Sequence, residues 1–289
     1  MIRRSIATGL GKLSQKMKSD SFIQDMIPIL KLLSNDDQDS VRVLCIDSIV
    51  LMSKVFTKEL NKANIIPILI LMIRDKAWKV RIKISNNYTA LAEAMGSEIT
   101  DHSLLNIFST LLTDPEGEVR LAATQNFTNF IKLVSKTKYG TLIPYCLDLN
   151  KDSIPLVRVC SYENTTIIAR HLPKEEVKAK LVGTIIANFK TEINNEVKIE
   201  LLKALTSCGV NLGVEFFTIV TSQDISNFLK EKSWRIRKEV YRMIAEVSSS
   251  TKSNQLFEVH FQDFFFTYLT DQVYQVRLFG NSLLPVSSL

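Results

Sequence analysis

Residues 40–43 read SVRV, and strings of the same kind recur along the chain at an almost constant interval. The later copies are KVRI at 79–82, EVRL at 118–121, LVRV at 156–159, EVKI at 196–199, RIRK at 235–238 and QVRL at 275–278. Their basic residues lie 39, 39, 38, 40, 39 and 40 positions apart and are Arg42, Arg81, Arg120, Arg158, Lys198, Arg237 and Arg277. Arg3 lies 39 residues before Arg42 and marks an eighth copy. Self-similarity at a fixed period of this length is typical of a repeat array.

Two further columns keep the same register. An acid stands five residues before each Val or Ile of the string, at Asp36, Asp75, Asp114, Asp152, Glu192, Glu231 and Asp271. Because acids make up only 30 of the 289 residues, this agreement does not arise by chance. Seven residues after the basic marker the column is apolar, at Leu10, Ile49, Tyr88, Phe127, Leu205, Ile244 and Leu284, with Thr165 as the exception. Seven residues make two helical turns, so we expect this column on the buried face of a helix.

The repeat unit can be divided further. Pro28, Pro67 and Pro144 each stand fourteen residues before their Arg and open an apolar run, which suits proline in a first helical turn. We therefore expect a helix A of about ten to thirteen residues, a short turn that contains the acid, and a helix B that begins near the Val–Arg pair. Two helices per ~40 residues is the HEAT pattern. Because no unit can bury its apolar faces alone, we predict an all-α solenoid of about seven or eight antiparallel helix pairs, forming one array over residues 1–289.

Each marker has an expected role. A carboxylate at the start of helix B would be stabilised by the exposed N–H groups there. The Val or Ile should point between the helices, and the Arg can reach a carboxylate of its own or of the neighbouring unit. Exposed ion pairs contribute only ~0–1 kcal/mol each. We therefore expect a row of them to set the register between repeats more than to supply stability.

The composition agrees with an α-rich fold. Hydrophobic residues make up 46% and charged residues 23%, as in folded chains, and 9 Gly and 7 Pro are too few for the turns of a β-sandwich or barrel. The longest apolar run, Ile65–Ile73, is nine residues, whereas a membrane-spanning helix needs ~20, so no membrane span is expected.

The net charge of +6 is concentrated at one end. Residues 1–19 carry Arg3, Arg4, Lys12, Lys16 and Lys18 and no acid, which gives +5 and leaves +1 for the rest. A nucleic-acid binder should instead carry basic residues along a face, so no nucleic-acid partner is expected. The acid-free start could also be read as a mitochondrial transit peptide. The repeat pattern is favoured because it accounts for the same residues.

No pattern indicates catalysis, a metal or a cofactor. The four cysteines show no CxxC spacing, and His102, His171 and His260 lie at no metal-ligand spacing, so reduced thiols are expected. The chain contains no GxGxxG, GxxxxGK[ST], HExxH or GxSxG string. The Phe-rich segment at 257–266 could form an aromatic box, but a buried helix A is favoured, with His260 exposed or hydrogen-bonded.

Residues 74–100 read RDKAWKVRIKISNNYTALAEAMGSEIT and resemble the scaffold (A) subunit of protein phosphatase 2A, a family built from fifteen HEAT repeats. SNDDQDSVRVLCIDSI at 34–49, TDPEGEVRLAATQNF at 113–127, EKSWRIRK at 231–238, LTDQVYQVR at 269–277 and the opening MIRRSIATGLGKL are similar to neighbouring family segments. In this order the chain would match the family's third to tenth repeats. LGVEFF at 212–217 departs from the pattern, because it resembles a string placed one repeat later in the family.

The resemblance implies a site. In the family, the ridge of turns between helices A and B receives regulatory subunits, and the final five repeats, which have no counterpart here, hold the catalytic subunit. The matching turn residues are Asp36, Asp37, Asp39, Asp75, Lys76, Trp78, Lys79, Asp114, Glu116, Glu118 and Trp234. Both Trp residues suit a contact surface, although each could instead cover its turn as a structural lid, and the acids could be solvated turns or helix caps.

We therefore expect a non-catalytic scaffold, monomeric within a hetero-oligomer, in the cytoplasm and also in the nucleus. A HEAT adaptor of nuclear transport or another phosphatase regulator is the alternative, followed by a nucleic-acid-binding array and by an enzyme with a HEAT-like fold. The chain begins partway through one expected repeat and ends about twelve residues after Arg277. We expect either a fragment of a longer scaffold, which would also hold the catalytic subunit, or a shortened relative.

Overall fold

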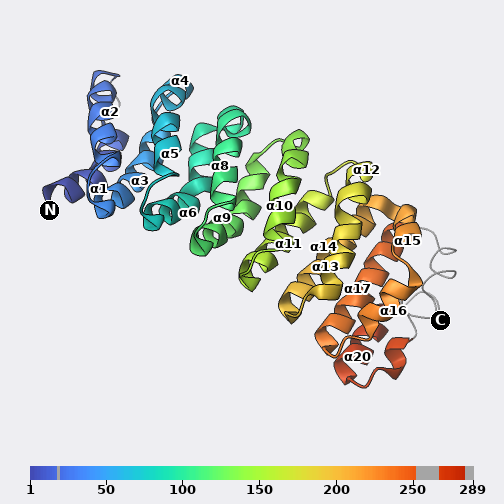
Figure 1. The fold of residues 1–289 in the computed structure, drawn as a ribbon. Coiled ribbons are helices and arrows are strands. Elements are labelled where there is room, and N and C mark those ends of the chain that lie inside the picture. Colours follow the sequence, from blue (N-terminus) through green and yellow to red (C-terminus); the bar gives the residue numbers. More distant parts are fainter. Residues whose placement is uncertain (18–19, 252–266, 284–289) are drawn as a thin grey trace. The chain divides into compact units, whose positions relative to one another are not determined.

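The computed structural model describes residues 1–17, 20–251 and 267–283. Every regular element in these ranges is a helix, which confirms the predicted all-α fold. The chain divides into two compact units, Met1–Tyr145 and Cys146–Leu289, which are described separately. In each unit the helices form two layers, with one helix of every repeat in each layer (Figure 1).

In the first unit, one layer holds the B helices α1 (Ile2–Lys16), α3 (Asp39–Ser53), α6 (Trp78–Met95) and α9 (Gly117–Phe130). The A layer holds α2 (Asp20–Ser34), then α4 (Lys58–Leu60), η1 (Asn61–Ile65) and α5 (Ile66–Met72), then α7 (Ser97–Ile99), η2 (Thr100–Leu104) and α8 (Leu105–Leu112). The short helices η3 (Ile131–Leu133) and η4 (Lys136–Leu142) lead to α10 (Ile143–Leu149). Each B helix packs on the next, α1 on α3, α3 on α6 and α6 on α9, so contacts join neighbouring repeats.

In the second unit, the B helices are α11 (Pro155–Ala169), α14 (Asn195–Leu212), α17 (Trp234–Thr251) and α20 (Tyr274–Leu283). The A segments are α12 (Lys174–Glu176), η5 (Val177–Val182) and α13 (Gly183–Thr191), then η6 (Gly213–Glu215), α15 (Phe216–Ile219) and α16 (Ser222–Leu229), with η7 (Thr267–Thr270) before α20. The B helices again pack in chain order. None of the described helices could cross a membrane alone; Asn195–Ile219 with Ser222–Leu229 passes by length and composition, but this pair is bent by 107°.

The two apolar columns form the core. The Val or Ile of the seven strings from 40–43 onward is fully buried, at Val41, Val80, Val119, Val157, Val197, Ile236 and Val276, whereas Ile2 before the Arg3 marker is 76% exposed. The described members of the second column are buried as well, at Leu10, Ile49, Tyr88, Phe127, Leu205 and Ile244. Thr165 is also buried, because its hydroxyl donates to the Ser161 carbonyl at 2.9 Å and needs no water. Leu284 and the Phe-rich segment 257–266, with His260, lie outside the described residues.

The expectation that proline stands in the first turn of a helix is wrong for Pro28, whereas Pro67 and Pro144 are each the second residue of a regular α-helix, in α5 and α10. Pro28 lies inside α2, and Pro67 follows α4 and a π-helical turn, so helix A begins at Asp20 and Lys58. The A helices are consequently longer than expected, with 15 residues in α2. A π turn widens the backbone and relieves the clash between a proline ring and the carbonyl four residues earlier. Thr100–Leu104 forms a π turn like Asn61–Ile65, although no proline follows it. Proline therefore does not cause the π turn, and Pro67 is only accommodated after one.

The burial of the second column can be tested by truncation. Ile49→Ala should lower the free energy of unfolding by about 2–5 kcal/mol, because it removes methylene groups from a fully buried site. Leu32→Ala, on an exposed site of α2, should change it by less than about 0.5 kcal/mol. Urea unfolding followed by far-UV circular dichroism measures both, and equal losses would contradict the assignment of the buried layer.

Candidate functional site: the ridge of interhelical turns

The acid of each repeat shapes the turn before helix B. Its carboxylate accepts a hydrogen bond from the backbone N–H two residues later, as from Gln38 to Asp36 at 2.9 Å and from Ala77 to Asp75 at 2.8 Å. The same bond occurs at Asp114, Asp152, Glu192 and Asp271. The acid thus lies before the helix as an Asx-type turn, instead of capping the helix itself. The carboxylate that was expected to cap helix B therefore holds the preceding turn instead.

The basic marker joins this turn to the next repeat. Arg42 Nε and Nη2 donate to the two carboxylate oxygens of Asp75, 33 residues away, at 2.6 and 2.7 Å. Its Nη1 donates to the Asp36 carbonyl of its own turn at 2.6 Å. Arg81 repeats both contacts with Asp114 and with the Asp75 carbonyl. Arginine suits this position because two N–H groups of its planar guanidinium point in the same direction and can bond both oxygens of one carboxylate.

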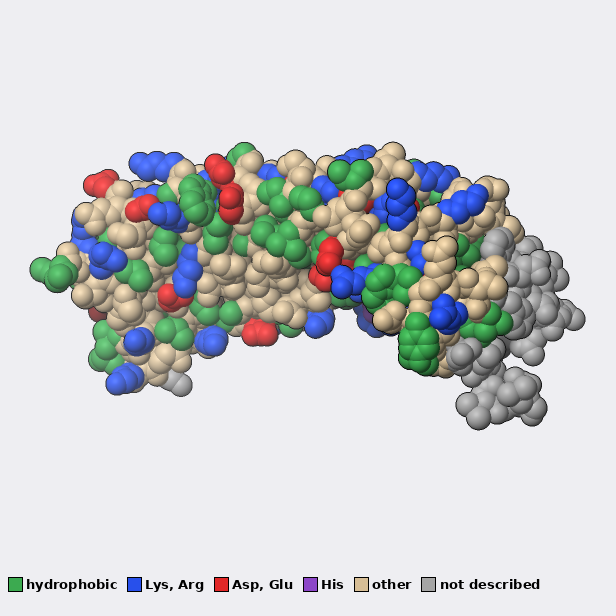
Figure 2. All heavy atoms as spheres, turned by 90° about the horizontal axis from the view of Figure 1, so that it is seen from below, with side chains coloured by type: hydrophobic (Ala, Val, Ile, Leu, Met, Phe, Trp, Pro, Cys, Tyr) green, Lys and Arg blue, Asp and Glu red, His purple; other side chains and the backbone are tan. Residues whose placement is uncertain are grey.

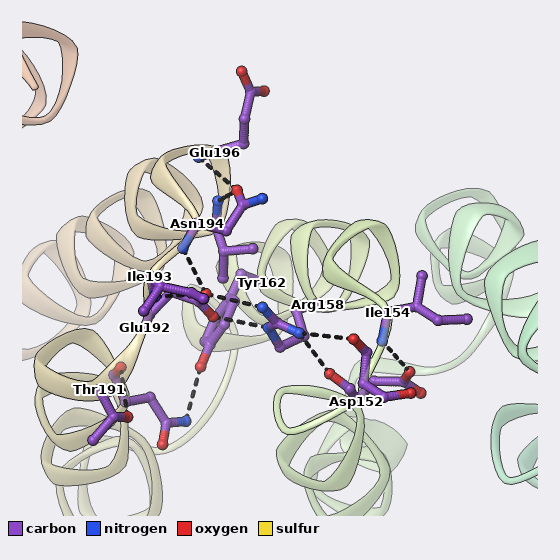
Figure 3. Close-up of polar contacts among 12 residues, drawn as sticks. Asp152, Ile154, Arg158, Tyr162, Thr191, Glu192, Ile193, Asn194 and Glu196 are labelled. Carbon is purple, nitrogen blue, oxygen red and sulfur yellow. Dashed lines mark hydrogen bonds and ion pairs between the residues drawn. The ribbon is translucent and has the colours of Figure 1, made fainter.

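The second unit holds an equivalent row. Figure 3 shows Arg158 between its own turn and the next one. There it donates to the Asp152 carbonyl at 2.7 Å and to both oxygens of Glu192 at 2.8 and 2.9 Å. Arg237 pairs with Asp271 in the same two-pronged way. Lys198 is the exception, because its ammonium makes a single contact with Glu231 at 2.6 Å.

These pairs are not exposed, which corrects the expectation from the sequence. The side chains of Arg42 and Asp75 are 6% and 8% exposed, and those of Arg81 and Asp114 are 10% and 4% exposed. Each pair joins side chains from two repeats, so the sequence of one repeat cannot reveal this burial. Removing one partner of a buried pair costs about 3–5 kcal/mol, because a charge is left unpaired. We call the row of pairs the arginine ladder.

The ladder shifts the ionisation of its members. The hydrogen bonds that Arg42 donates to Asp75 raise the pKa of Arg42, and the hydrogen bonds that Asp271 accepts from Arg237 lower the pKa of Asp271. A lowered carboxylate pKa stabilises the fold above the ordinary Asp value, and this contribution is lost as the pH falls through the folded-state pKa. The Asp271 carboxylate therefore remains charged, and its oxygens remain bound to Arg237, at neutral pH.

The predicted site residues divide into two groups. The carboxylates of Asp36, Asp75 and Asp114 lie in the ladder. The others in the first unit are exposed at three successive turns and comprise Asp37, Asp39, Lys76, Trp78, Lys79, Glu116 and Glu118. Trp234 is half-buried in the second unit, beside Arg235. Partner contact by any of these residues stays a prediction.

The exposed turn residues carry alternating charge, which we call the turn ridge. Asp37 and Asp39 make the first turn acidic, and Glu116 and Glu118 make the third turn acidic. The second turn is basic, with Lys76 and Lys79. Trp78, 42% exposed, stands between these two lysines in sequence, and Lys79 Nζ lies 5.8 Å from its ring centroid. An exposed aromatic flanked by charges of defined sign suits a protein partner.

Other chemistry finds no support among the described residues. They contain no group of His, Cys, Asp and Glu that could hold a metal ion. All four cysteines are buried, and burial raises the pKa of Cys45 to about 12, so this thiol is unreactive. Basic side chains on the face in Figure 2 are spread among acidic and apolar ones, without the basic stripe typical of nucleic-acid binders.

Sequence reasoning missed one surface. Leu32 and Leu71 are 74% and 73% exposed on the A helices, although they occupy equivalent positions 39 residues apart. The sequence contained this information, because a leucine recurs in two successive repeats at a position outside the two buried columns. An apolar side chain that recurs outside the buried column indicates a repeated surface feature.

The ladder predicts unequal effects for two substitutions that both remove a pair between repeats. Arg42→Gln should lower the free energy of unfolding by about 3–5 kcal/mol, since it leaves Asp75 buried without its cation. Lys83→Gln breaks the half-exposed pair with Asp47 and should cost at most about 1 kcal/mol. Urea unfolding distinguishes them; similar small losses would contradict the structural role of the ladder.

Comparison with known proteins agrees with this architecture. The family model described as PIK3R4-like, middle domain, matches residues 11–205. The regulatory (A) subunit of protein phosphatase PP2A from Schizosaccharomyces pombe is 39% identical over 59 residues, which are 20% of this chain and 10% of that protein. The resemblance seen in the sequence is thus confirmed over part of the chain, while the match to the third to tenth repeats stays a prediction.

Solved structures support the fold. The karyopherin Kap121p, bound to the extreme C-terminus of the protein phosphatase Cdc14p, superposes with a TM-score of 0.63 at 16% identity, over 91% of this chain and 27% of that one. An engineered protein gives a TM-score of 0.52 at 15% identity, over 78% of this chain and 97% of its own. The chain therefore spans less than a third of the karyopherin and a tenth of the phosphatase regulator. The fold is a helical solenoid, as predicted.

Proposed function

The chain belongs to the PIK3R4-like middle-domain family, and from this premise we propose that it is a non-catalytic scaffold for a phosphatase of the 2A type. The turn ridge of the first unit presents the contact surface to a regulatory subunit. The observation that carries the proposal is the exposed Trp78 with Lys76 and Lys79 between two acidic turns. The partial identity with the phosphatase 2A regulator supports the choice of partner.

The ladder suits this role because it fixes the backbone of each turn. Arg81 bonds the Asp75 carbonyl on one side and Asp114 on the other, so two successive turns of the ridge share one side chain. Turns held in this way lose little conformational freedom when a partner binds. Their exposed side chains can therefore bind through preformed geometry.

The alternating charge should select the partner. A docking surface that carries basic, acidic and basic groups in order would be attracted to all three turns, whereas a uniformly charged one would be repelled by at least one turn. Because exposed charges are screened over about 8–10 Å, this attraction should weaken with salt. We place the scaffold in the cytoplasm and also in the nucleus, and its buried free thiols suit such reducing compartments.

The proposal predicts loss of capture without loss of fold. Trp78→Ala combined with Lys79→Glu should reduce recovery of a phosphatase 2A regulatory subunit by about tenfold or more, since it removes an aromatic contact and reverses a charge. The measurement is affinity purification of the tagged full chain from its native cells, with the captured protein identified by mass spectrometry. Circular dichroism should show unchanged helicity.

Lys132→Glu, at an exposed site away from the turn ridge, serves as the matched control and should leave capture unchanged. Undiminished capture by the double variant would contradict the assignment of the ridge. Recovery of a small GTPase or a transport cargo, and of no phosphatase component, would favour the nuclear-transport adaptor instead.

A further inference from the structure

A groove of about 710 Å³ lies in the first unit, where the C-terminal end of α2 meets α5. The two helices contact each other and lie side by side (Figure 1). Pro67, Leu71 and Met72 supply an apolar wall, and Lys31 and Lys76 lie at the rim. The Arg42–Asp75 pair lines the same groove. A volume of this size accommodates several side chains of a ligand.

The two helices that line the groove also carry exposed apolar side chains, of which Leu71 lines the groove itself. Leu32 and Leu71 are largely exposed, and Ile29 and Ile70 are each 40% exposed on the same helices. A single exposed leucine needs no explanation, but the same exposed leucine on the A helices of two adjacent repeats is a repeated surface feature. In the following repeat, the positions equivalent to Pro67, Ile70 and Leu71 are polar, namely Asn106, Ser109 and Thr110. The exposed apolar side chains of α5 are therefore a local feature and not a property of every A helix.

The charge of the groove is positive at its rim. Lys31 and Lys76 are exposed and form no ion pair within the described ranges, and neither does Arg74, which follows α5 in the adjoining turn. The carboxylates of Asp36 and Asp75 are neutralised by Arg3 and Arg42. Only the exposed Asp37 opposes the lysines among the groove's lining residues. The surface therefore attracts carboxylates and repels a basic segment.

We propose that this groove binds a short linear segment of a partner protein in which leucine-sized side chains stand next to carboxylates. The leucine packs against Pro67 and Leu71, while the carboxylates bind Lys31 and Lys76. Combining an apolar anchor with charges at the rim gives both affinity and orientation. The inference rests on the proposed scaffold function, because the groove adjoins the turn ridge and would give the same partner a second point of attachment.

A synthetic peptide tests this chemistry directly. The probe is a fluorescein-labelled peptide of about ten residues with two adjacent leucines flanked by Asp and Glu, titrated with the full chain and followed by fluorescence anisotropy. We expect a Kd on the order of 10–100 μM, which is ordinary for a short segment in an open groove. Peptides with Ser in place of Leu, or Lys in place of the acids, should bind at least about tenfold more weakly.

Variants of the chain locate the binding site. Leu71→Thr introduces the residue that the next repeat carries at Thr110, and Lys76→Glu reverses a rim charge; each should weaken binding about tenfold. Lys54→Glu is the matched control, because Lys54 follows the 15-residue helix α3 and lies about 22 Å along it from the turn. All three positions are exposed, so the fold should persist in each variant.

The outcomes separate the groove from the scaffold proposal. Absence of binding at about 1 mM peptide, equal binding of the Lys peptide, or unchanged binding by Leu71→Thr and Lys76→Glu would overturn the groove assignment. Regulatory-subunit capture that persists in that case leaves the turn ridge in place. Peptide binding that survives Trp78→Ala while capture of the regulatory subunit is lost supports the groove as a second site that shares Lys76 with the turn ridge but does not need Trp78.

Discussion

The contact between an arginine of one repeat and a carboxylate of the next is the interaction on which the rest of the structure depends. Each complete pair uses two nitrogens of the guanidinium for the neighbouring acid and a third for a backbone carbonyl of its own turn, as Arg42 does with Asp75 and Asp36. Burying both charges is costly, and it is tolerated only because nearly every polar group is satisfied. The pair therefore holds only when adjacent repeats stack in the correct register.

This constraint separates the acids of the turns into two roles. Asp75 and Asp114 hold the turn and the next repeat, and their carboxylates are covered. Asp37, one residue after Asp36, and Glu116, two residues after Asp114, remain exposed to solvent. A turn can thus vary its exposed residues, and with them its partner, while the buried acid maintains the architecture. Such separation of framework and contact residues is common for loops on a rigid scaffold.

Much of the fold follows from the sequence, because the repeat is regular. The 39-residue period predicted that Val41 and Val80 point into the core, and both are fully buried. It also identified the columns of arginines and acids, which form ion pairs between neighbouring repeats. Burial of the ladder could not be predicted, since it depends on how adjacent repeats stack. The start of the A helices was misjudged at Pro28, which lies inside α2, and a π turn that local preferences do not reveal precedes α5, where Pro67 stands in the first turn as expected. In the candidate site, exposure distinguished Trp78 from the half-buried Trp234, and only the structure supplied that distinction.

A double-mutant cycle on Arg81 and Asp114 measures the coupling between repeats most directly. The wild type, Arg81→Gln, Asp114→Asn and the double variant are unfolded in urea, and the interaction energy is the difference between the double change and the sum of the single ones. A buried two-pronged pair between neighbouring repeats requires a favourable coupling of about 2 kcal/mol or more. A coupling below about 0.5 kcal/mol would show that the two repeats stack without the ladder.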